Sequence, residues 1–232
     1  MDFWKLQSML QKGAIYFSRG DKQNDKLEGE YPPNMINELE RRFGRLKSDD
    51  GKSYTFLEWH NQKEIPSRLL SCWNICSFES KKRWSEYTTN TQSIAIRSTI
   101  GRLKNCFAVE SSEGPVVWIG KIRYGEKENI LPDSYHKWNV NYFLYPFFGK
   151  KEKYRWEKEI RATVNISQKK QRNLNHVSNG YFIKATLNVL IGSIWLHPRA
   201  GEGFYYEVKE SLNDSSYAAI PIFQSCWEGI KE

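Results

Sequence analysis

The order of strand-like and helix-like segments constrains the fold of this chain more than any other feature. Short stretches that alternate between apolar and polar residues, as β-strands do, are mixed with short helical patterns in no regular order. No internal repeat is present at a period of roughly 20 to 50 residues, which excludes a solenoid. We therefore expect an α+β fold with a mainly antiparallel sheet core and flanking helices.

Several segments carry this expectation. Apolar residues at helical spacing predict a first helix that stops at Gly13, with a strand over residues 14–17. Residues 70–78 predict a largely buried strand, and residues 154–164 alternate over the longest strand that the sequence predicts. The aromatic segment 138–148 predicts a helix broken after Phe148. No stretch resembles an interdomain linker, so we expect residues 1–232 to form a single domain.

Charge and composition narrow the function. The net charge of +8 favours an anionic partner such as RNA, DNA or a nucleotide phosphate. The sequence has neither a long apolar run nor a secretory leader pattern, so we expect a cytoplasmic protein that does not enter membranes. Its four cysteines and four histidines lack the spacing of metal ligands, so no metal is expected.

The segment from Trp156 to Arg161 contains the sharpest motif, Trp-Glu-Lys-Glu-Ile-Arg. Alternation along a strand would place Glu157, Glu159 and Arg161 on one face. Two carboxylates and a guanidinium are costly to bury together unless they bind something. One interpretation is that this Glu-x-Glu pair binds a ligand. The other is that the segment forms a solvated sheet face with a surface ion pair.

Two smaller groups suggest a nucleotide site. Polar residues that include Ser18, Asn24 and Asp25 follow the first expected strand, although such residues also form ordinary loops. Ser77 ends another expected strand, shortly before Trp84 and Tyr87. A hydroxyl beside aromatic rings can hold a ribose or a flat base, and it can equally form the edge of a core.

A basic and aromatic segment precedes the Glu-x-Glu motif. Aromatic planes and cations together are typical of grooves for single-stranded nucleic acid. The residues concerned are Lys150, Lys151, Lys153, Tyr154, Arg155 and Trp156. The alternative is an aromatic core followed by a solvated basic turn.

Taken in order, these fragments resemble a widespread, uncharacterised bacterial domain family. The resemblance rests on Ile-Tyr-Phe-Ser at 15–18, the Asn24-Asp25 pair with Glu28-Gly29, Cys-Ser-Phe-Glu at 76–79, Trp84 with Tyr87, and Trp-Glu-x-Glu-x-Arg at 156–161. The family's layout is in turn similar to the ADP-ribosyltransferase fold. Some members of that wider group are intracellular toxins of anti-phage and toxin–antitoxin systems, including toxins that modify nucleic acid.

The resemblance implies an activity with NAD as substrate. Glu159 would stabilise the oxocarbenium-like transition state, and Glu157 would orient or deprotonate the acceptor. The turn before the motif would bind the acceptor, for which RNA is favoured, and a neutralising antitoxin protein is a possible partner. The residues implied for NAD binding are Tyr16, Ser18, Arg19, Asn24, Asp25, Ser77, Trp84, Tyr87 and Arg161.

The sequence departs from the family pattern at one place. The family has a Tyr-Lys-Tyr-Arg-like strand ahead of the first helix, where a His or Arg would grip nicotinamide, and only residues 1–4 stand there in this chain. Arg19 or Arg97 is expected to take that role. Two other functions stay open: a non-catalytic nucleic-acid-binding module of a defence operon, and a metal-dependent nuclease using Asp133, Glu207 and Lys209.

Overall fold

The computed structural model describes most of the chain, in two compact units. The described residues are 1–23, 25, 28–48, 51–77, 79–108, 115–125, 143–166, 176–177 and 179–226. The first unit combines Met1–Tyr16, Cys76–Gly114 and Phe182–Glu232, and the second unit combines Phe17–Ile75 and Pro115–Tyr181. Each unit is built from separate stretches of sequence. The expectation of a single domain over residues 1–232 stays a prediction.

The largest sheet follows the strand order β10-β11-β1-β4-β9-β6. Its strands are β1 (Ala14–Arg19), β4 (Arg68–Asn74), β6 (Trp118–Lys121), β9 (Glu159–Asn165), β10 (His176–Val177) and β11 (Gly180–Lys184). The pairs β1–β4, β4–β9, β6–β9 and β10–β11 are all antiparallel. The expected α+β class with a mainly antiparallel sheet and flanking helices is confirmed.

Strand β9 lies between β4 and β6 and is buried on both faces. Ile160, Ala162 and Val164 give one face its apolar surface, as their alternation predicts. The opposite face carries polar residues that are equally buried, including Glu159 and Arg161. A central strand with a buried polar face must satisfy those groups from the surrounding chain, and that requirement creates the candidate site.

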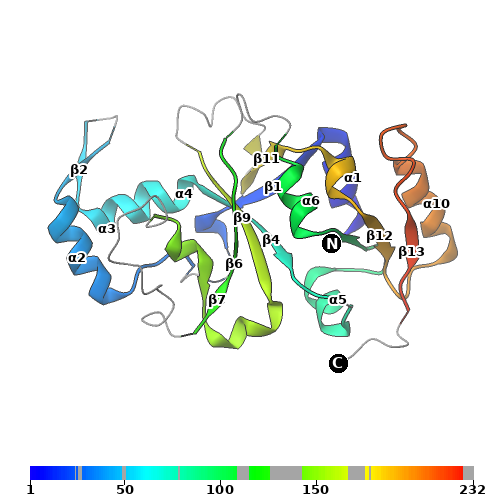
Figure 1. Ribbon diagram of the computed structural model, residues 1–232, viewed down its shortest axis with the longest axis horizontal. Helices are drawn as coiled ribbons and strands as arrows, with labels where there is room; N and C mark the ends of the chain where they lie inside the picture. Colours follow the sequence, from blue (N-terminus) through cyan, green and yellow to red (C-terminus); the bar gives the residue numbers. More distant parts are fainter. Residues whose placement is uncertain are drawn as a thin grey trace. The chain divides into compact units, whose positions relative to one another are not determined.

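Helices of the second unit form their own small core. The helical elements are α2 (Pro33–Phe43), α3 (Phe56–Trp59), the π-helical turn η2 (His60–Glu64) and α4 (Ile65–Ser67), which lie together in Figure 1 with strand β2 (Leu46–Lys47) of the β2–β3 hairpin. Strand β3 is Ser53–Tyr54. A capping box starts α3, because Thr55 and Glu58 each bond the other's backbone N–H. Tyr31, Met35, Leu39 and Phe56 fill the core between these helices.

The first unit contains a three-stranded sheet, ordered β13-β12-β5. Strand β12 (Ser193–Leu196) pairs antiparallel with β5 (Ile94–Arg97) and parallel with β13 (Ile222–Gln224). The helices of this unit are α1 (Phe3–Lys12), α5 (Lys81–Tyr87), α6 (Ile100–Asn105), α9 (Leu187–Leu190) and α10 (Glu202–Ser211). Helix α1 packs on α10 through an edge-to-face pair of Phe3 and Phe204, with ring centroids 5.2 Å apart.

The predicted start of the chain is confirmed, because α1 ends at Gly13 in a left-handed conformation and β1 follows directly. The strand expected over residues 154–164 is wrong in its first half. Residues Glu152–Glu157 form a 3-10 helix, η6, and Lys158 then adopts a left-handed φ of 45° before β9 begins. Of the helix expected over 138–148, residues 138–142 lie outside the described part, and Tyr145–Phe148 form the 3-10 helix η5.

Two short strands join these turns to the sheet region. Strand β7 (Arg123–Tyr124) pairs in parallel with β8 (Gly149–Lys150). The ring of Phe148 packs directly against the backbone of Gly120 in β6. A Cβ at Gly120 would lie only 2.9 Å from Phe148 Cε1. The segment after η5 is thereby held over the polar face of β9. Among the described helices, none combines the length and apolar character needed to cross a membrane.

Candidate active site

Glu159 and Arg161 form the centre of the candidate site, on the polar face of β9. They are two residues apart in a strand and so share a face, as the sequence predicts. Arg161 Nε donates to Glu159 Oε1 at 2.8 Å. The Arg161 side chain is fully buried and that of Glu159 is 3% exposed. This ion pair is therefore an interior feature of the second unit, not a surface contact.

The Arg161 guanidinium donates to two further partners besides Glu159. Arg161 Nη1 donates to the backbone carbonyl of Phe147 at 2.7 Å, and Nη2 donates to the carboxylate of Glu28. A buried guanidinium needs such partners, because an unpaired charge in the interior costs several kcal/mol, on the order of 3 to 5. Arg161 thus ties β9 to residue 28 and to η5.

Lys150 occupies the same cluster from strand β8. Its Nζ lies 2.7 Å from Glu157 Oε2, 2.8 Å from Glu159 Oε2 and 3.9 Å from Glu28 Oε1. Burial opposes its charge, but the carboxylates of Glu159 and Glu28 raise the pKa of Lys150 above its ordinary value. Three carboxylates around two permanent cations leave the cluster with one excess negative charge when all are ionised.

The two glutamates of the motif have opposite pKa shifts. Burial would raise the pKa of Glu159, yet Arg161 and Lys150 lower it to about 2, so that this carboxylate is ionised at neutral pH. Burial raises the pKa of Glu157 above its ordinary value despite the bond from Lys150. Two carboxylates whose environments separate their pKa values can divide acid–base and electrostatic roles between them.

The polar face opens toward solvent at Cys72 and Asn74 of β4. Their register places Cys72 opposite Arg161 and Asn74 opposite Glu159. Cys72 is exposed and its thiol donates to Glu159.

Two backbone contacts fix the turn that carries Glu157. Asn74 Nδ2 donates to the carbonyl of Glu157 at 2.8 Å. The backbone N–H of Glu159 donates to the hydroxyl oxygen of Tyr124 at 2.7 Å. Because that oxygen accepts, the proton of the Tyr124 hydroxyl is directed elsewhere. Burial raises the pKa of this hydroxyl, which keeps it protonated as a donor at the edge of the cluster.

The residues that the sequence predicted for NAD fall into both units. In the second unit, Ser18 donates to the carbonyl of Leu70 at 3.3 Å, and Arg19 forms a two-bond ion pair with Asp21 at 2.9 and 2.8 Å. Asp25 is half-buried, and Asn24 lies outside the described residues. The Arg161 side chain is fully buried. Of this set, Arg161 alone belongs to the Glu159 cluster described above.

The remaining predicted NAD residues belong to the first unit. Ser77 and Tyr87 are exposed, Tyr16 packs against Phe182 with ring centroids 5.4 Å apart, and Trp84 is 5% exposed. The indole N–H of Trp84 donates to Glu79 at 3.0 Å. Arg97, the second candidate for the missing nicotinamide contact, is exposed at the end of β5. Their part in an NAD site stays a prediction.

The predicted acceptor residues separate into an inner and an outer set. Lys150 lies inside the carboxylate cluster, whereas Lys151 and Lys153 are exposed. The ammonium groups of Lys150 and Lys153 lie 5.4 and 4.8 Å from the ring centre of Tyr154. The remaining two are Arg155, which pairs with Glu152 on the surface, and the half-buried Trp156.

Sequence reasoning did not assign Cys72, Asn74 or Tyr124 to the site. Cys72 and Asn74 lie two positions apart in a predicted strand, so alternation places them on one face, but only the pairing with β9 shows which face that is. Tyr124 carries no sequence signal. Among the described residues, no group of three or more His, Cys, Asp or Glu has the arrangement of a metal site.

Comparison with protein-family models, with curated proteins and with solved structures found no match to this chain.

Proposed function

We propose that the second unit carries the catalytic carboxylates of an NAD-dependent ADP-ribosyltransferase. The observation that carries this proposal is that Glu157 and Glu159 share one cation, the half-buried Lys150, yet their pKa values are shifted in opposite directions. One carboxylate is a fixed negative charge and the other is a base of raised pKa. Transfer of ADP-ribose requires both kinds of group.

The fixed charge is suited to the bond-breaking step. When the bond between nicotinamide and the ribose C1′ breaks, its electron pair leaves with nicotinamide and positive charge develops on the ribose. Glu159 is ionised and held by Arg161 and Lys150, so it stabilises that charge without reorganising during the reaction. The excess negative charge of the cluster acts in the same direction.

Glu157 is suited to the bond-forming step. Its side chain is 11% exposed, against 3% for Glu159, and is the more accessible of the two carboxylates. The acceptor's nucleophilic atom attacks C1′ and transfers its proton to Glu157, while the new glycosidic bond forms. A raised pKa brings Glu157 closer to the range in which a general base works at neutral pH.

A nucleic acid is the acceptor that the surroundings favour. Lys151 and Lys153 are exposed six and four residues before Glu157, and the ring of Tyr154 lies beside Lys153. Phosphates would meet the lysines and a base would stack on the ring. RNA is favoured, and the place of such an enzyme as a toxin of anti-phage defence follows from the family resemblance alone.

The test is transfer of label from NAD carrying a labelled adenylate to total RNA, DNA or protein from a bacterial lysate. The proposal expects incorporation into one acceptor class and release of nicotinamide. Glu152→Gln is the matched control, because Glu152 is a glutamate in the same 3-10 helix that pairs only on the surface with Arg155. Absence of both transfer and NAD hydrolysis under all acceptors would overturn the proposal. Incorporation that persists in Glu159→Gln would do so as well.

A further inference from the structure

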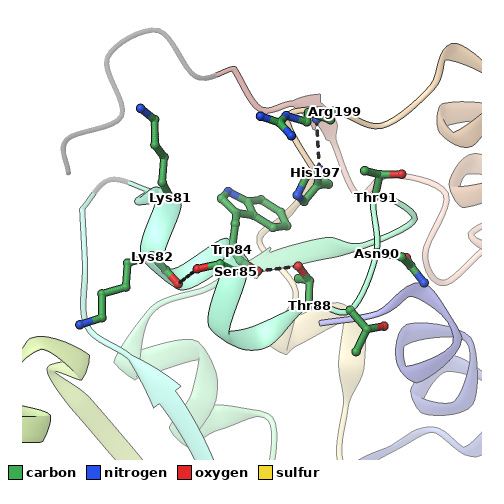
Figure 2. A pocket seen from close by; sticks show the side chains of 10 residues that line it. Lys81, Lys82, Trp84, Ser85, Thr88, Asn90, Thr91, His197 and Arg199 are labelled. Carbon is green, nitrogen blue, oxygen red and sulfur yellow. Dashed lines mark hydrogen bonds between the residues drawn. The ribbon is translucent and has the colours of Figure 1, made fainter.

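The first unit contains a cavity that the transferase proposal does not use. It has a volume of about 450 Å³ and lies between helix α5, the turn at residues 88–91 and the segment that follows β12 (Figure 2). Its lining consists of Lys81, Lys82, Trp84, Ser85, Thr88, Thr89, Asn90, Thr91, His197 and Arg199. Small-molecule sites commonly have volumes of about 300 to 1,000 Å³, so a nucleoside monophosphate has room there.

We propose that this cavity binds a phosphate ester of a sugar, of the size of a nucleoside monophosphate. The phosphate would meet Lys81 and Arg199, and the sugar hydroxyls would meet Ser85 and Thr88. The inference concerns the first unit alone and does not depend on the transferase proposal.

The charged residues that line the cavity are all basic. Lys81, Lys82 and Arg199 are among the lining residues, and none of the ten is acidic. In Figure 2 Arg199 lies beside His197, and the ammonium groups of Lys81 and Lys82, both on helix α5, point away from the Trp84 ring. Phosphate oxygens are strong acceptors with negative charge, so they pair with ammonium and guanidinium groups in such a place.

Two carboxylates accept hydrogen bonds from residues that line the cavity. Glu79 accepts from the indole of Trp84 at 3.0 Å and also from the hydroxyl of Ser225. Asp2 accepts from the backbone N–H and the hydroxyl of Thr89 at 2.8 and 3.1 Å. Both therefore anchor the walls of the cavity.

His197 lines the cavity beside Arg199. Its Nδ1 accepts the backbone N–H of Arg199 at 3.1 Å, so the proton of the neutral ring belongs to Nε2. The ring packs edge-to-face on Trp84, with centroids 5.1 Å apart and an interplanar angle of 79°. Burial, with the charge of Arg199 second, lowers the pKa of His197 and favours this neutral form. The ring orientation is thus fixed by two contacts.

Three hydroxyl groups that line the cavity already donate their protons within the protein, so they meet a ligand as acceptors. Ser85 donates its hydroxyl proton to the carbonyl of Lys82 at 2.9 Å, and Thr88 donates to the carbonyl of Trp84 at 2.5 Å. Thr89 donates to Asp2. Each oxygen retains lone pairs, which repel phosphate oxygens and accept from O–H or N–H groups. A ligand must therefore carry anionic oxygens at one end and hydroxyl donors at the other, as a sugar phosphate does.

The experiment is isothermal titration of the full chain with four probes: ribose 5-phosphate, adenosine monophosphate, inorganic phosphate and ribose. We expect both phosphate esters to bind, inorganic phosphate to bind more weakly, and ribose not to bind. Binding of the nucleotide alone would identify a base contact in addition. Binding of none of the probes at millimolar concentration would overturn the proposal.

Variants locate the site. Lys81→Ala and Arg199→Ala should each lower the affinity for the phosphate esters at least tenfold, because each removes a charge-assisted contact. Ser85→Ala should lower the affinity for ribose 5-phosphate several-fold and leave the affinity for inorganic phosphate unchanged. Lys104→Ala, an exposed lysine on α6 in the same unit, is the matched control and should change nothing.

The outcomes separate this proposal from the previous one. Glu159→Gln should keep ester binding intact, since Glu159 belongs to the other unit. Circular dichroism shows whether each variant is folded. Equal affinity of Lys81→Ala, Arg199→Ala and the unchanged chain would place the ester elsewhere and overturn the proposal.

Discussion

Lys150 and Arg161 hold the two oxygens of one carboxylate. Lys150 Nζ lies 2.8 Å from Glu159 Oε2, and Arg161 Nε lies 2.8 Å from Glu159 Oε1. Lys150 also lies 2.7 Å from Glu157, so the two glutamates of the motif compete for one cation. The charge state of either glutamate therefore affects the other, and the site responds to substitution as a unit.

Substitution of the two glutamates should have different effects. Glu159→Gln should abolish both transfer and NAD hydrolysis, because removal of a central electrostatic group costs about 3 kcal/mol or more of transition-state stabilisation. Glu157→Gln should abolish transfer and leave slow hydrolysis, since water can replace the acceptor without a base. Release of nicotinamide and incorporation of label measure the two activities separately. Equal and mild losses in both variants would identify the cluster as structural.

Lys150→Met should destabilise the fold. It leaves the carboxylates of Glu157 and Glu159 without their shared cation, and breaking a buried pair costs about 3 to 5 kcal/mol. Urea unfolding followed by fluorescence measures the change. Lys151→Met, at the exposed neighbouring position, should stay within about 0.5 kcal/mol of the unchanged chain. A loss at Lys151 as large as that at Lys150 would contradict this assignment.

Acid should weaken the fold through Glu159. Its pKa is lowered from 4.5 to about 2, so its contribution to stability is complete above pH 4.5 and is lost as the pH falls toward 2. A shift of this size corresponds to about 3 kcal/mol. Urea midpoints measured between pH 6 and pH 2 would show the decline. The Glu159→Gln variant lacks the titrating carboxyl at position 159, so its urea midpoint should decline less steeply over the same pH range. An equal slope for the variant and the unchanged chain would contradict the prediction.

Gly120→Ala should be destabilising although its backbone is ordinary. A Cβ at this position would lie 2.9 Å from Cε1 of Phe148, so the ring must move, and overpacking of this kind costs about 1 to 3 kcal/mol. Thermal unfolding measures the loss. Gly201→Ala is the control, since nothing lies within 4 Å of a Cβ there. Identical melting temperatures for the two variants would show that the Phe148 packing is loose.

Salt dependence tests the acceptor surface. Lys151→Ala with Lys153→Ala should flatten the logarithmic salt slope of RNA binding by about 1.4, at about 0.7 for each phosphate contact. Tyr154→Ala should instead weaken binding by roughly 1 to 3 kcal/mol with little change in slope, because a stacking ring carries no charge. Lys47→Ala, an exposed lysine of β2, serves as the control. No detectable RNA binding at low salt would remove nucleic acid as the acceptor.

Local patterns in the sequence predict some elements well and the site only in part. Helix α1 and its stop at Gly13 follow from apolar spacing and from the left-handed freedom of glycine, both local properties. Strand alternation likewise predicts that Glu159 and Arg161 share a face. It does not predict that Glu28, 133 positions before Arg161, completes the ion pair. Glu28 lies in a turn outside any strand, and its contact with Arg161 depends on how distant stretches of the chain pack together, which no local pattern encodes.

The basic turn shows the same difference. By composition, Lys150 and Lys151 are equivalent neighbours, and the sequence predicts one surface for both. In the structure Lys150 closes the carboxylate cluster, while Lys151 is exposed as the residue that precedes η6. Lys150 is the last residue of strand β8, whereas Lys151 lies outside it, directly before η6, and composition does not indicate this boundary.

The left-handed turn at Lys158 affects how such sites can be recognised in other sequences. Glu157 and Glu159 meet at Lys150 although they belong to different elements, a 3-10 helix and a strand. Their separation along the chain is therefore a property of the turn and not of strand alternation. A turn one residue longer or shorter could present the same two carboxylates to the same lysine. A search that demands glutamates two positions apart would overlook such chains, whereas one that allows a variable gap before the strand would retain them.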